Sequence, residues 1–187
     1  MRKWIICAAL FLTMHVSVMA VSLSELGTNP QKYVKVYETP AYALWVDTST
    51  VKEVRKSPPY YILQANEFLV DYPSATIGQF QEEVTYDYNR STNGLIKLIY
   101  SQTPNITPEI FMGRYAREGI ANSGMTYSSK ILRIYYLDGR IKFDHLSDSM
   151  AYNEKIRAGS DIFDVANFMF KQQYGFYFLR PSTTAKA

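Results

Sequence analysis

Cysteine and histidine are almost missing from this chain. Its one cysteine is Cys7, and its two histidines are His15 and His145. Beyond residue 20 this excludes a disulfide framework, a cysteine-based zinc site and a thiol nucleophile. The sequence also has no Gly-x-Ser-x-Gly, His-Glu-x-x-His, glycine-rich phosphate loop or Asp-x-Asp-x-Asp-Gly calcium loop. We therefore expect no enzyme, with no catalytic residue, no metal site and no cofactor.

Long apolar runs are also scarce, and the one at the start has the pattern of a secretory signal peptide. Arg2 and Lys3 form a basic start, residues 4–12 are apolar, and Val18-Met19-Ala20 suits cleavage after residue 20. The run is short and interrupted by polar residues, whereas a membrane span needs about 20 mostly apolar residues. We expect 1–20 to be a signal peptide, 21–179 a single domain and 180–187 a flexible tail. The product would reach the periplasm, the cell surface or the medium, with no membrane span after cleavage.

The net positive charge of the chain is mostly lost when the leader is removed. Lys plus Arg falls from 20 to 18 while Asp plus Glu stays at 17, so the formal net charge drops from +3 to +1. A near-neutral domain has no general attraction to nucleic acid or to acidic lipid. We therefore expect no nucleic-acid partner.

The strongest local signal present is an amphipathic helix within Gly159–Gly175. Ser160 is a good N-cap, two aspartates follow in the first turn, and Lys171 lies near the carboxyl end, as the helix dipole favours. Gly175 suits a left-handed stop. Apolar residues recur at intervals of three and four and must be buried against another element. These residues are Ile162, Phe163, Val165, Ala166, Met169, Phe170 and Tyr174.

Most other segments alternate apolar and polar residues, which indicates strands. The predicted strands are 33–37, 41–46, 60–72, 80–88, 95–101, 125–137 and 140–146. Residues 60–72 alternate less clearly, so a helix is the alternative there, but their β-rich ends favour a strand. Asp47 to Thr50 reads as a turn, and Val51 to Val54 leads into a polar loop. Asn93-Gly94 and Asp138-Gly139 are strong hairpin turns.

Two further segments complete the reading. Thr107-Pro108 predicts the start of a short helix that ends near Gly119, and 147–158 is polar with room for a helical turn. The expected fold class is α+β: a single antiparallel meandering β-sheet of about six to seven strands with one C-terminal amphipathic helix packed on one face.

Tyrosine is the one residue type in excess, with 16 copies. Tyrosine fits a half-buried pleated surface, so a core role is the first interpretation. The second is a contact surface, because tyrosine buries its ring and keeps its hydroxyl bonded. His145 is the one histidine beyond the leader, and its neighbour Asp144 would point to the opposite face of a strand. A structural role for His145 is therefore favoured over general-base catalysis.

Two stretches resemble a known family. Tyr33-Val34-Lys35-Val36-Tyr37, followed by Ala43 to Val51, is similar to the opening of surface-adhesin protein E-like domains. Thr85 to Arg90 resembles a Tyr-Asp-polar strand of such exported bacterial proteins, and Arg157 to Ser160 resembles their Pro-Gly-Ser helix start, with Ala158 in place of proline. The cysteines of the adhesin are missing. The resemblance implies an exported bacterial, non-enzymatic domain with an adhesive role, and it transfers no site residue.

Three functions follow as hypotheses. The first is a binding or adhesion domain that meets a protein or host-surface ligand through a tyrosine-rich sheet surface, with an exposed aromatic patch of several hundred Å². The second is a carrier or sensor for a small apolar ligand, with Phe163, Met169 and Phe170 lining a pocket of roughly 300 Å³ between sheet and helix. The third is an enzyme that uses His145. The first accounts for most of the observations.

Overall fold

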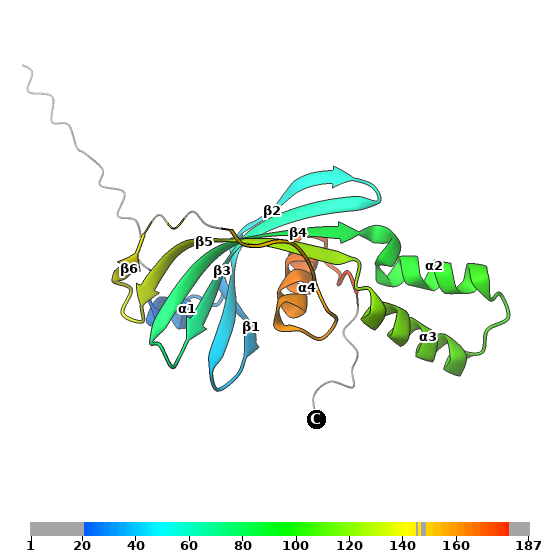
Figure 1. Cartoon of the computed structure of the whole chain (residues 1–187), viewed down its shortest axis with the longest axis horizontal. Helices are drawn as coiled ribbons and strands as arrows, with labels where there is room; N and C mark the ends of the chain where they lie inside the picture. The colour runs from blue at the N-terminus through cyan, green and yellow to red at the C-terminus, as the bar shows by residue number, and fades with distance from the viewer. Residues whose placement is uncertain (1–20, 145, 147–148, 180–187) are drawn as a thin grey trace, which may run out of the picture.

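One curved antiparallel sheet and four helices make up the part of the chain that the structure, a computed structural model, describes: residues 21–144, 146 and 149–179. The predicted fold class is confirmed, because the sheet has seven strands and the last helix packs on one of its faces (Figure 1). The predicted leader 1–20 and tail 180–187 lie outside the described residues, and so does His145.

The helices are α1 (Leu23–Thr28), α2 (Thr92–Gln102), α3 (Pro108–Ala121) and α4 (Asp161–Tyr174), with one 3-10 turn at Tyr88–Arg90. The strands are β1 (Tyr33–Glu38), β2 (Tyr42–Ser57), β3 (Tyr60–Asp71), β4 (Thr76–Asp87), β5 (Met125–Tyr136), β6 (Ile141–Phe143) and β7 (Ser149–Lys155).

The strand order follows the chain from β1 to β5, and every pair is antiparallel. The free side of β5 is then shared: β7 pairs with Thr126 to Lys130, and β6 pairs with Ile134 and Tyr135. The helix pair α2 and α3 interrupts the meander between β4 and β5 and projects beyond the end of the sheet (Figure 1).

Helix α4 forms for the local reasons that the sequence shows. Ser160 Oγ accepts a hydrogen bond from the backbone N–H of Phe163 at 3.3 Å, and Gly175 ends the helix in the left-handed region at φ 81°. Ala166, Met169 and Phe170 are buried, while the predicted stripe member Ile162 is partly exposed. Burial of about five large side chains stabilises the fold by roughly 10 kcal/mol at most.

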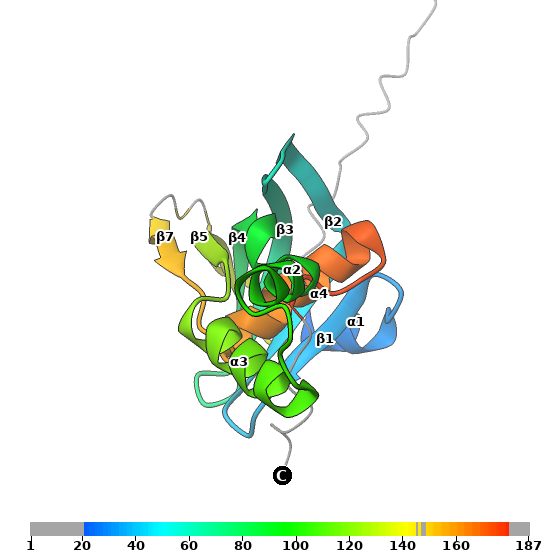
Figure 2. The ribbon, with the colours of Figure 1, turned by 90° about the vertical axis from the view of Figure 1, so that its right-hand side faces the viewer.

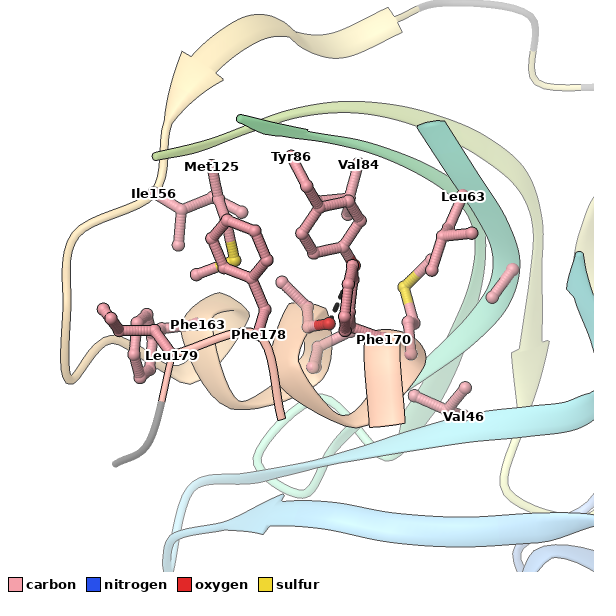
Figure 3. Packing of buried hydrophobic residues seen from close by; sticks show 14 of the residues in the cluster. Val46, Leu63, Val84, Tyr86, Met125, Ile156, Phe163, Phe170, Phe178 and Leu179 are labelled. Carbon is pink, nitrogen blue, oxygen red and sulfur yellow. Dashed lines mark hydrogen bonds between the residues drawn. The ribbon is translucent and has the colours of Figure 1, made fainter. Parts of the chain in front are cut away.

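The sheet has a core on each face. Side chains of α4 meet alternate residues of the strands in the larger core, which Figure 3 shows between the helix and the curved sheet. Tyr86 spans this core, and its hydroxyl donates to the carbonyl oxygen of Ala166 at 2.7 Å. The smaller core lies on the opposite face, where Leu26 of α1 packs with Phe68 and Tyr135.

The predicted hairpin at Asn93-Gly94 is wrong, because residues 92–102 form helix α2. Ser91 caps the helix by accepting from the Gly94 N–H at 3.1 Å, and Leu95 and Ile99, four residues apart, are both fully buried. A glycine is required at position 94 because the backbone there passes close to the carbonyl oxygen of Asn89, and an added Cβ would lie 2.3 Å from that oxygen. The residue is therefore not the turn glycine of a hairpin.

The predicted turn at Asp47 to Thr50 and the loop after it are also wrong, because β2 continues to Ser57. The turn-forming side chains make an irregularity within the strand instead, where the pairing with β3 skips between Asp47 and Lys52. Asp47 Oδ1 accepts from the Ser49 N–H at 3.0 Å, so the expected local hydrogen bond forms without ending the strand.

The segments around α3, the β5–β6 hairpin and β7 agree with the sequence predictions only in part. The helix expected from Thr107-Pro108 is confirmed as α3, and the Asp138-Gly139 hairpin is confirmed between β5 and β6. The return strand is shorter than the predicted 140–146, since β6 spans Ile141–Phe143. The helical turn expected within 147–158 is replaced by β7, which pairs with β5.

Candidate binding surface

The tyrosines divide between the core and the outside. Tyr33, Tyr86 and Tyr135 are among the largest fully buried side chains. Each hydroxyl has a partner, because Tyr33 donates to Glu25 at 3.2 Å and Tyr135 donates to Gln79 at 2.8 Å. These tyrosines stabilise the fold and offer no contact surface.

Helix α4 covers the aromatic face of the sheet. Phe170 of α4 packs edge-on against Tyr61, with ring centroids 6.5 Å apart. Tyr42 donates to Asp161 Oδ2 at 2.7 Å, and this hydrogen bond is the main reason why the pKa of Tyr42 rises to about 12. On the opposite face, strand alternation places Gln64, Gln81 and similar polar residues. The broad faces of the sheet are therefore either covered or polar.

Several large exposed apolar side chains lie along one edge of the sheet, which we call the β6–β7 edge. It consists of Tyr136 at the end of β5, Ile141 and Phe143 on β6, and Met150 and Tyr152 on β7. Met150 is 66% exposed and Tyr152 is 78% exposed. Among the strands that the structure describes, β6 and β7 pair with β5 alone, and Figure 2 shows β7 at the margin of the sheet beside β5.

Basic side chains cover one part of this edge. The guanidinium of Arg140 lies 5.3 Å from the centroid of the Tyr136 ring, and Lys142 Nζ lies 5.6 Å from the same ring and 5.8 Å from Phe143. Such cation–π contacts hold the aromatic rings in place at a modest gain in energy. Asp138 fixes Arg140 in turn through a 2.8 Å ion pair.

Strand β7 has an irregular backbone. Asn153 adopts φ 52°, and the pairing with β5 shifts register twice along the strand. Irregularities of this kind re-aim side chains at sheet edges. Natural edge strands are usually blunted by charge or by cover, whereas Met150 and Tyr152 are large, apolar and exposed. This edge is thus suited to contact with another molecule.

Two carboxyl groups lie buried under α4. Glu67 on β3 and Glu82 on β4 are 6% and 3% exposed, and Ser129 donates to Glu82 Oε1. Oε2 of each has no hydrogen-bond partner within the described chain. Burial, with Glu82 and Asp161 nearby, raises the pKa of Glu67 well above its usual range. Burial also raises the pKa of Glu82 to about 7, against the opposing effect of the Ser129 hydrogen bond.

This carboxyl pair is missed by the sequence reasoning, which found no pair among the scattered acidic residues. The alternation of the strands carried the available signal. Glu82 lies on the same face of its strand as the apolar Val84 and Tyr86, and Glu67 lies on the same face as Leu63. Burial therefore favours the neutral form of both carboxyl groups. Neither of the two surface hollows described next lies beside this pair.

The larger hollow, of about 420 Å³, is lined by residues of α2 and the turn before it, including Arg90 and Lys97. The second, of about 360 Å³, lies at the carboxyl end of α4 beside Lys171 and Tyr177. Phe163, Met169 and Phe170, proposed from the sequence as pocket-lining residues, line neither hollow and are buried in the core.

Comparisons with known protein families, with curated proteins and with solved structures gave no match. Within the described residues, no group of three or more His, Cys, Asp or Glu side chains is placed to hold a metal ion. In the same part of the chain, no helix combines the length and hydropathy needed to cross a membrane.

Proposed function

We propose that this chain is an exported, non-enzymatic bacterial binding domain of adhesion type that contacts a protein partner through the β6–β7 edge. The observation that supports it is that five large apolar side chains are exposed along one edge of the sheet. Exposed apolar groups that gather in one patch are typical of interaction sites, and aromatic residues and methionine are enriched there. The signal-peptide pattern and the adhesin resemblance support export and adhesion.

The partner best suited to this edge is an extended segment of another protein. A strand at the edge of a sheet can be joined by a peptide strand through backbone hydrogen bonds, and neighbouring side chains then select the sequence. Met150 and Tyr152, two residues apart on β7, supply apolar contacts of the right spacing. A carrier of a small apolar ligand is not favoured, since Phe163, Met169 and Phe170 fill the space between sheet and helix.

Selection from a displayed peptide library on the purified full-length chain tests the binding surface. Selected peptides should be extended and apolar, and Met150→Lys and Tyr152→Lys should each weaken their binding at least about tenfold. Tyr60→Lys is the matched control, because Tyr60 is an exposed tyrosine that starts β3, outside the edge. Peptides that bind all three variants equally well, or a library without any binder, would refute the proposal.

Export is tested separately by sequencing the amino terminus of the protein recovered from outside the bacterial cytosol. Cleavage after Ala20 predicts a chain that starts at Val21. Recovery of the chain only in the cytosol with Met1 in place would contradict the export proposal and would leave the peptide experiment intact.

A further inference from the structure

Helix α3 exposes several apolar side chains on the side that faces away from the rest of the molecule. Ile110, Met112 and Ile120 are each at least 60% exposed, and Ala116 between them is exposed as well. The other side of α3 packs on α2, where Phe111 stacks against Tyr100 with ring centroids 5.2 Å apart. Large apolar side chains that share one exposed helix face are typical of a contact surface.

The charged side chains of α3 also divide between the side that packs on α2 and the outward side. The charged side chains on the α2 side have partners within the chain. Arg114 donates to Thr103 Oγ1 at 3.0 Å, and Glu118 forms an ion pair with Arg90 at 3.4 Å. Glu109 and Arg117 lie on the outward side and are exposed, and within the described chain neither has an ion-pair partner. They are eight residues apart, about 12 Å along the helix.

Gly113 lies midway between these two charges. It is in the middle of a 14-residue helix, where glycine weakens the helix relative to alanine. A Cβ at this position would meet nothing within 4 Å, so no contact in the described chain requires a glycine. A glycine on an exposed helix face allows a second backbone to approach closely.

We propose that the outward side of α3 binds the same side of α3 in a second copy of this chain. When two helices cross at about 50°, their i, i+4 rows align with each other. The row Glu109–Gly113–Arg117 would then run antiparallel to its copy about a two-fold axis at Gly113. Each Glu109 meets Arg117 of the other copy, and the Met112–Ala116–Ile120 rows lie side by side. This arrangement is isologous and closed.

The self-complementary charge row is the reason to choose a second copy over an unrelated partner. One helix crossing buries less than the roughly 1,200 Å² of a standard interface, which places the dimer among weak and reversible complexes. Its dissociation should therefore be measured at protein concentrations from about 10 µM to about 1 mM.

Analytical ultracentrifugation of the full-length chain across this range tests the proposal. We expect a monomer–dimer equilibrium whose Kd rises at least about tenfold in Glu109→Arg and in Arg117→Glu, because each change sets like charges against each other at both ends of the row. The double exchange E109R/R117E should return the Kd to within about threefold of the original. Lys97→Glu on α2 is the control that changes the charge of the same helix pair outside the row.

Disulfide capture supplies a second measurement that does not depend on the charges. A Cys7→Ser, Gly113→Cys chain has a single thiol, and mild oxidation should link two copies through residue 113, since a disulfide requires Cα atoms within about 7 Å. Ser101→Cys in the same background, on the exposed side of α2, should stay monomeric. A monomer at every concentration, or a dimer indifferent to both charge reversals and to Gly113→Leu, would overturn the proposal.

Discussion

Replacing Glu82 by glutamine should change how the stability of this protein depends on pH. The side chain lies under α4, is 3% exposed and has a pKa raised by burial from 4.5 to about 7. Glutamine keeps the size of the side chain and an oxygen that can accept from the Ser129 hydroxyl, but it cannot ionise. The substitution therefore removes the titration and leaves the packing in place.

The sign of the effect follows from proton linkage. The native protein holds the proton on Glu82 more tightly than the unfolded chain does, so the stabilisation is complete below pH 4.5 and is lost as the pH rises through about 7. At about 1.4 kcal/mol per pH unit, the interval from 4.5 to about 7 corresponds to a loss of roughly 3 kcal/mol. Burial raises the pKa of Glu67 as well, which adds a loss in the same direction.

Urea unfolding between about pH 4.5 and pH 8.5 measures this difference directly. The free energy of unfolding of Glu82→Gln minus that of the original protein should be near zero at the acid end and rise by roughly 3 kcal/mol toward pH 8.5. Tyr127 on β5 faces the same region and is present in both proteins, so its contribution largely cancels.

Glu83→Gln is the control, because Glu83 is the next residue of β4, lies on the opposite face and is half-exposed. It should show no comparable dependence on pH. A difference between Glu82→Gln and the original protein that stays constant across the range would refute the reasoning, because burial would then not be raising the pKa of Glu82.

Two further substitutions test the local contacts that hold the fold. Ser160→Ala should lower the free energy of unfolding by about 1 kcal/mol, because it removes the N-cap of α4. Thr107→Ala should lower it by less, because Thr107 makes no side-chain cap bond to α3. Equal losses of the two variants in chemical denaturation would contradict this expectation. Gly124→Ala should destabilise by more than about 1 kcal/mol, since Gly124 has φ 71° and an added Cβ would lie 2.2 Å from Arg90 Cβ. Gly27→Ala should not destabilise the protein in this way, because an added Cβ there meets nothing within 4 Å. Thermal melts in which neither glycine variant differs from the original protein would count against the argument.

Elements with strong local signals could be predicted from the sequence. Helix α4 follows from Ser160, Gly175 and an apolar stripe, all within 16 residues, and the structure has each of them in the expected role. The β-rich ends of residues 60–72 and the alternation of residues 125–137 likewise predicted β3 and β5 closely. These signals act between neighbours along the chain, so no knowledge of distant contacts is required.

Prediction failed where distant contacts override a local preference. Asn93-Gly94 is a strong hairpin signal by itself, yet the segment folds as α2, which buries Leu95 in the core together with side chains of α4 and of the sheet. The turn signal at Asp47 to Thr50 is likewise overridden, because β3 continues to pair beyond it with residues up to Ser57.

The sequence by itself determined the fold class, the helix that packs on the sheet and most of the strands, because periodicity and capping are properties of short segments. Only the tertiary structure decided which tyrosines are buried and which apolar side chains meet at the β6–β7 edge. It also decided that Glu67 and Glu82 share one buried site. Strand register and helix packing set these outcomes, and they depend on residues far apart in the chain.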